Sequence, residues 1–149
     1  MIFLRLGSIA VAMLLTFNVF AKTDPVYTGF FSSLAVGGYD VVAYFTESKP
    51  VQGKSKFSFE YMNTEWRFAS AENLVLFKAE PEKFAPQYGG YCAWAVSQGY
   101  TARGNPKNWR IEDGKLYLNY DNEVQATWEK YIPGFIGLAD KNWPAILAE

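Results

Sequence analysis

The sequence predicts an α+β fold, in which a small antiparallel sheet from two hairpins is packed with several short helices. Two segments alternate apolar and polar residues around short turn signals, which is typical of half-buried hairpins. Between and after these segments, apolar residues recur at helical spacing behind side chains that cap helices. Of the 149 residues, 50% are hydrophobic, which is enough for a domain with its own core.

The first expected elements follow the glycine pair Gly37-Gly38. Asp40 is placed to accept hydrogen bonds from the free amides of a short helix over residues 41–45. Residues 57–61 and 66–68 both alternate with the strand period, so we expect them to pair as a hairpin.

A helix is expected after this hairpin, over residues 71–79. Ser70 caps its start, and Leu74 and Phe77 would face inward. Pro81 prevents the helix from continuing, because proline lacks the amide that the next helical hydrogen bond needs.

The second hairpin, over residues 109–120, gives the clearest local signal in the chain. Asp113-Gly114 suits a type I′ turn, and alternation on both arms gathers four apolar residues on one face. These residues are Trp109, Ile111, Leu116 and Leu118.

Helices are expected on both sides of the second hairpin. Residues 91–96 fit a buried helix, and Asp121 or Asn122 caps a further helix that Pro133-Gly134 breaks. A last short helix over residues 135–143 would stop at Pro144. The sequence shows no internal repeat and no low-complexity stretch.

The N-terminus predicts export. An apolar run over residues 6–20 follows Arg5 and ends in small residues at the −3 and −1 positions of a cleavage site after Ala21. A run of about 15 residues suits a signal peptide and is shorter than the roughly 20 of a membrane helix. We therefore expect a periplasmic or secreted protein without a stable membrane span after cleavage. Residues 22–36 would form a loosely ordered lead-in, and residues 37–149 the domain.

Composition excludes several kinds of chemistry. The chain has no histidine, which removes a serine triad, a Cys–His dyad and the usual zinc sites. Its single cysteine, Cys92, cannot form an intramolecular disulfide. The net charge of −1 and the lack of like-charge blocks argue against nucleic acid as a partner. These absences favour a protein without catalytic activity, and no cofactor is implied.

Five segments together resemble the exported YHS-domain-like proteins: residues 37–45, 66–70, 81–93, 116–120 and 128–130. The wider group of YHS domains implies a metal role carried by cysteines or histidine. At the matching positions this chain has Ala43, Ala69 and Asn73, none of which is a soft donor. The resemblance therefore implies the fold, and the group's metal site is not carried over. Cys92 is left as the only candidate ligand for a soft metal.

The candidate ligand-binding residues cluster around the two glycine-rich turns of the sequence. They are Asp40, Tyr44, Tyr88, Gly89, Gly90, Tyr91 and Cys92. The tyrosines could line a cleft between the first short helix and the Cys92 segment, or pack in the core. The glycines could let a ligand approach the backbone, or serve a turn. Cys92 could be a small buried hydrophobe, or a thiol whose pKa is lowered near the start of a helix.

Three functions stay open from the sequence. The leading hypothesis is an exported, non-catalytic binding module with an aromatic and thiol-lined cleft, for a small-molecule or soft-metal ligand. A second is thiol-based redox or copper(I) chemistry at Cys92, in a monomer or shared across a homodimer. A third is a protein-interaction domain of the cell envelope.

Overall fold

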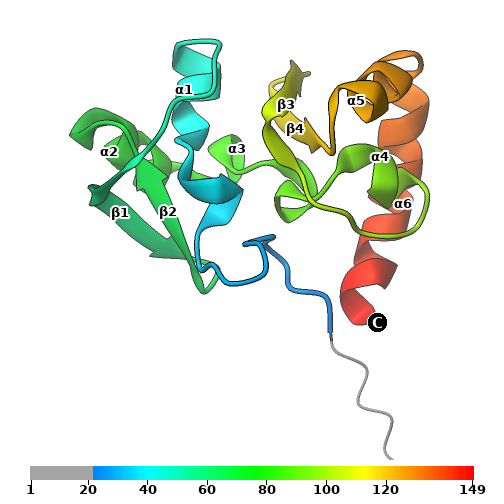
Figure 1. The fold of residues 1–149 in the computed structure, drawn as a ribbon, viewed down its shortest axis with the longest axis horizontal. Helices are drawn as coiled ribbons and strands as arrows, with labels where there is room; N and C mark the ends of the chain where they lie inside the picture. Colours follow the sequence, from blue (N-terminus) through cyan, green and yellow to red (C-terminus); the bar gives the residue numbers. More distant parts are fainter. Residues whose placement is uncertain (1–21) are drawn as a thin grey trace, which may run out of the picture.

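A computed structural model describes residues 22–149, so the signal peptide expected over residues 1–21 lies outside the described residues. Each of two hairpins is preceded by a tight turn with a short helix and followed by further helices (Figure 1). In chain order the elements are η1 (Ala35–Gly38), α1 (Val41–Thr46), β1 (Lys54–Tyr61), β2 (Thr64–Phe68), α2 (Ala71–Ala79), α3 (Pro81–Phe84), η2 (Gln87–Gly90), α4 (Ala93–Ser97), β3 (Asn105–Glu112), β4 (Lys115–Asn119), α5 (Asn122–Glu129) and α6 (Ile132–Ala148).

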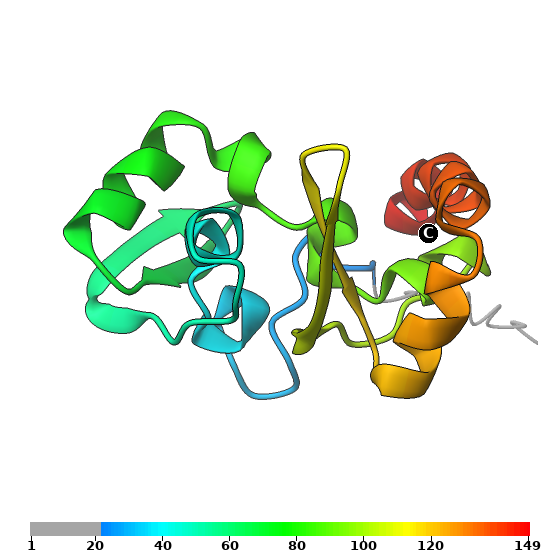
Figure 2. The same cartoon turned by 90° about the horizontal axis from the view of Figure 1, so that it is seen from above.

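The α+β class is confirmed, but the hairpins form two separate two-stranded antiparallel sheets instead of one. Figure 2 shows β3 and β4 standing between the first group of elements and α4, α5 and α6. The neighbouring elements therefore pack against the two faces of the second hairpin. A hairpin that is apolar on both faces gains more by burying them than by extending a sheet at one edge.

Capping and turn residues in the sequence predicted the positions of most elements correctly. Ser70 accepts a hydrogen bond from Asn73 N at 3.1 Å and begins α2 at the expected residue. Asp121 caps α5 in the same way, through Val124 N at 2.9 Å. Asp113 and Gly114 both have positive φ, at 49° and 73°, as a type I′ turn requires.

The expected end of the last helix at Pro144 is wrong. Helix α6 begins at Ile132 and runs through Pro144 to Ala148. It lies along α4, where the Asn142 side chain donates to Val96 O at 3.0 Å and to Ser97 O at 3.1 Å. Beyond the proline, Ile146 is 6% exposed and packs in the core. Tertiary packing of this kind outweighs the local cost of a proline inside a helix.

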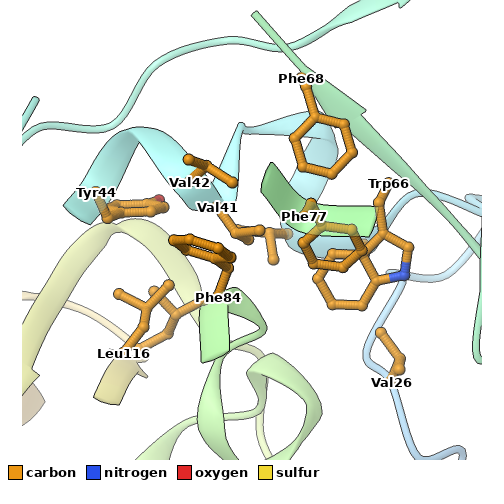
Figure 3. Close-up of a cluster of buried hydrophobic side chains, with 12 residues drawn as sticks. Val26, Val41, Val42, Tyr44, Trp66, Phe68, Phe77, Phe84 and Leu116 are labelled. Carbon is orange, nitrogen blue, oxygen red and sulfur yellow. The ribbon is translucent and has the colours of Figure 1, made fainter. Parts of the chain in front are cut away.

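The described residues contain two hydrophobic cores. The first core lies among η1, α1, β2, α2 and α3, and Figure 3 shows the Trp66, Phe68 and Phe77 side chains grouped together in it. The second core lies among η2, α4, β4, α5 and α6, around Tyr117 and Trp128.

Strand β4 contributes to both cores. Leu116 and Leu118 belong to the first core, and Tyr117 between them belongs to the second. Successive side chains of a strand point to opposite faces, so a single strand can separate two apolar cores. The expected face of Trp109, Ile111, Leu116 and Leu118 is confirmed as the face that meets the first core. Within residues 22–149, no helix combines the length and apolar character that crossing a membrane requires.

Candidate functional site

The Asp40 carboxylate is the centre of a buried hydrogen-bond network. Its side chain is fully buried at 0% exposure. Oδ1 accepts from Val42 N at 2.9 Å and from Ala43 N at 3.2 Å, which caps α1 as expected. Oδ2 accepts from Ala69 N and from Asn73 Nδ2, both at 2.8 Å. One carboxylate thus joins the starts of α1 and α2, which lie about 30 residues apart in the chain.

This network occupies the place where the resemblance would put metal ligands. Ala43, Ala69 and Asn73 all surround Asp40, and each contributes a nitrogen donor to its carboxylate. Donors of this kind neutralise an anion and offer nothing to a cation. Among the described residues, no group of three or more His, Cys, Asp or Glu side chains could hold a metal ion.

The three candidate tyrosines are distributed over the two cores. Tyr44 is 0% exposed in the first core, and its hydroxyl donates to Pro106 O at 2.6 Å. Tyr88 and Tyr91 belong to the second core, and their hydroxyls donate to Asp140 Oδ1 at 2.8 Å and to Asp24 O at 3.0 Å. The structure therefore does not bring these side chains into one cleft. Their role in ligand binding stays a prediction.

The two candidate glycines serve a close approach of the chain to itself. Gly89 has a φ of 61°, and a Cβ built on it would lie 1.9 Å from Pro25 O. The Gly89 carbonyl accepts from Tyr27 N at 2.9 Å, and Val26 beside it is 3% exposed. Part of the segment expected to be a loose lead-in is thus held against η2. Gly90, with a φ of 85°, completes the same turn.

Cys92 is a buried thiol. The side chain is 1% exposed, and its Sγ donates to Asn119 Oδ1 at 3.5 Å. Burial raises the pKa of the thiol, although the backbone N–H groups of Ala95, Tyr120 and Trp94 partly lower it. The lowered pKa considered from the sequence is therefore wrong, because α4 has only five residues and desolvation dominates. A protonated, enclosed thiol disfavours redox or copper(I) chemistry, which needs an accessible thiolate.

A small cavity of about 180 Å³ opens beside Cys92, and we call it the Cys92 pocket. Its lining residues are Cys92, Trp94, Ala95, Tyr100, Ala102, Tyr120 and Val124. The Trp94 and Tyr100 rings meet edge to face, with centroids 6.4 Å apart. The Arg103 guanidinium lies over the Tyr120 ring at 4.8 Å from its centroid. Partly exposed aromatic rings thus form the rim, and the sulfur lies at the base.

Sequence reasoning found only Cys92 among these lining residues. Its partners lie on α4, the loop after α4, the end of β4 and α5, and only the fold brings them together. The high aromatic content of 18% was the one signal that pointed to such a site. A second, more polar cavity of about 480 Å³ is lined in part by Tyr88, Asp140, Lys115 and Trp143.

Comparison with known proteins finds a family model that matches one segment of the chain. The family model described as YHS domain matches residues 42–88, from within α1 to within η2. The chain contains a YHS domain. The match begins two residues after Asp40 and takes in its hydrogen-bond donors at residues 42, 43, 69 and 73 and the first hairpin. It excludes the second hairpin, α5, α6 and the Cys92 pocket. Neither the comparison with curated proteins nor that with solved structures finds a match.

The buried tyrosines of this YHS-domain protein predict alkaline unfolding. Burial raises the pKa of Tyr44, Tyr88 and Tyr91, and raises that of Tyr117 from 10.0 to about 12. In the unfolded chain these groups ionise near pH 10, so their stabilising contribution is complete below pH 10 and is lost as the pH rises toward 12. Each proton that the folded chain retains and the unfolded chain has lost makes the free energy of unfolding decrease by about 1.4 kcal/mol more per pH unit. Urea unfolding at pH 8, 10 and 11, followed with tyrosinate absorbance, measures this. Full tyrosine ionisation at pH 10 in a folded chain would contradict it.

Proposed function

We propose that the protein is an exported, non-catalytic binding module whose ligand site is the Cys92 pocket. The observation that carries this proposal is the cavity of about 180 Å³ lined by Trp94, Tyr100, Tyr120 and a buried thiol. The cavity opens to solvent on one side and is lined mostly by apolar atoms, which suits a molecule about the size of benzene. The class of ligand that fits is therefore a small, uncharged molecule with an apolar or aromatic body.

The absence of catalysis is supported by the state of Cys92. Burial raises the pKa of its thiol, so the weakly nucleophilic protonated form prevails at neutral pH. The chain has no histidine that could act as its base. A neutral sulfur at the base of an aromatic pocket instead offers a polarisable contact, of the kind that sulfur makes with ring edges.

Filling the pocket is expected to abolish binding. Val124 is half-buried on its wall, so Val124→Phe places a ring in the cavity and should weaken benzene binding by more than about tenfold. Benzene titration followed by NMR chemical shifts of pocket residues measures this. The matched control is Val75→Phe, the same substitution at a position on α2 that is 64% exposed, which should leave binding unchanged. Absence of shifts in the unsubstituted protein, or equal shifts in both variants, would exclude the pocket as the site.

Export is supported by the pattern of residues 1–21. Cleavage after Ala21 would leave a mature chain from Lys22 to Glu149. The intact mass of protein recovered from the envelope or the medium decides this part of the proposal. A mass that still includes residues 1–21, on protein found in the cytoplasm, would reject export and leave the binding proposal to its own test.

A further inference from the structure

The turn at η2 repeats the turn at η1. Val36, Gly37 and Gly38 have φ angles of 52°, 59° and 83°. The corresponding values over residues 88–90 are 56°, 61° and 85°. Positive φ on three successive residues, including one non-glycine, is rare in proteins. Each turn then leads through two residues, of which the first is an extended tyrosine, into a short helix, α1 or α4.

The two hairpins repeat each other with a constant offset. Every bound of β3 and β4 lies 51 residues after the matching bound of β1 and β2, as Lys54 and Asn105 illustrate. The irregularity in pairing also recurs at the same place. It falls between Lys54 and Ser58 in the first hairpin and between Asn105 and Trp109 in the second. Helices α2 and α5 then begin 51 residues apart, each behind a capping side chain.

Cys92 stands in the place of Asp40. Each residue comes directly before its short helix, and each backbone amide donates across to the following loop, to Val51 O at 2.8 Å and to Ala102 O at 2.9 Å. The Asp40 carboxylate accepts from the backbone of residues 42, 43 and 69. The backbone N–H groups that lower the pKa of the Cys92 thiol belong to residues 94, 95 and 120, which are the same positions one unit later. In this unit the Trp94 N–H donates to Asn119 Oδ1 at 3.1 Å, and the Cys92 sulfur donates to the same oxygen at 3.5 Å.

We propose that residues 87–148 form a second YHS-type unit, a diverged counterpart of residues 35–84. The space that the Asp40 network fills in the first unit is then open in the second unit, where it forms the Cys92 pocket. Ala95, Tyr120 and Val124 of the pocket correspond to Ala43, Ala69 and Asn73. In the first unit the Asn73 amide reaches Asp40 at 2.8 Å and closes this space. In the second unit Val124 does not bridge to the sulfur, and the space opens. The assignment of a ligand to this space rests on the proposed function.

The way the units pack explains why their sequences diverged. The outer face of the second hairpin carries Leu116 and Leu118, at 0% and 1% exposure, because it packs on the first unit. The matching residues of the first hairpin are Glu65 and Arg67, which form an ion pair at 2.9 Å on a partly exposed face. The units thus stack in one direction (Figure 2), and matching positions face different surroundings.

The test places first-unit residues into the second unit. In C92D the new carboxylate meets backbone N–H groups equivalent to those that serve Asp40, while Asn119 Oδ1, an acceptor 3.5 Å from the sulfur, opposes it. We therefore expect the unfolding equilibrium constant to rise by about tenfold. The control A95D puts the same charge at a position that is 1% exposed and has no such donors, and should raise that constant more than about 100-fold. Urea unfolding of the full mature chain measures both. An equal loss of stability in the two variants, or failure of both to fold, would overturn the proposal that residues 87–148 form a second YHS-type unit.

A double-mutant cycle adds an independent result. V124N places an amide at the position equivalent to Asn73 in the first unit. The unfolding equilibrium constant of C92D/V124N should therefore be about tenfold lower than the effects of the two single substitutions predict when added. Zero or unfavourable coupling would also overturn the correspondence. Benzene titration of C92D/V124N separates the two proposals, because the closed pocket should no longer bind. If favourable coupling is found but the unsubstituted protein never binds benzene, the second unit stands and the proposed function fails.

Discussion

Replacing Asp40 by alanine is expected to lower the free energy of unfolding by roughly 3–5 kcal/mol, which is a large part of the stability of a small domain. The carboxylate accepts four hydrogen bonds at 0% exposure, and alanine would leave the donors of Val42, Ala43, Ala69 and Asn73 without their acceptor. Water cannot reach all of these groups without opening the contact between α1 and α2. Urea unfolding at neutral pH, followed by far-ultraviolet circular dichroism, measures the loss.

Two further variants separate this network from an ordinary helix cap. Asp121→Ala removes a cap that accepts one backbone hydrogen bond from Val124 N, and should cost about 1 kcal/mol. Asp40→Asn retains the shape of the side chain but turns one acceptor oxygen into a donor that faces other donors, so its loss should be closer to that of Asp40→Ala. A cost for Asp40→Ala no larger than for Asp121→Ala would show that the carboxylate acts only as a cap.

Asp40 also shows how far sequence reasoning reached. Its capping role depends on residues two and three positions ahead, and that part was predicted correctly. Its bonds to Ala69 and Asn73 depend on how β2 and α2 return to α1, and no local pattern encodes that return. The bounds of α2 and the turn at Asp113-Gly114 were predictable for the same reason as the cap, because each rests on neighbouring residues.

The Cys92 pocket and the repeat were beyond such reasoning. Cys92, Tyr100 and Val124 meet only because the second hairpin and α5 fold back over α4. The repeat is carried by backbone angles and by hairpin pairing, while matching side chains differ as much as Asp40 and Cys92 do. A comparison of amino-acid identities cannot detect a structural repeat of this kind. Helix α6 passes Pro144 for a tertiary reason as well, because packing along α4 favours its continuation.

The second large effect is expected at Phe77, where alanine should lower the free energy of unfolding by roughly 3–5 kcal/mol. The ring is 0% exposed at the centre of the first core (Figure 3). Its centroid lies 5.1 Å from that of Trp66 and 4.9 Å from that of Phe68, and two further rings meet it from β1. Alanine would leave a cavity that these rigid rings cannot fill, since aromatic side chains adjust by rotation and not by bending.

The adjacent residue supplies the control. Leu76 on the same helix is 44% exposed, so Leu76→Ala removes a comparable side chain outside the core and should cost less than about 1 kcal/mol. Guanidinium unfolding of both variants, followed by tryptophan fluorescence, measures the difference, because Trp66 reports directly on the lost ring contact. Similar losses at the two positions would mean that α2 is stabilised by its own helical hydrogen bonds and not by the aromatic core. The first unit would then depend on the Asp40 network, and not on Phe77, to hold α2 in place.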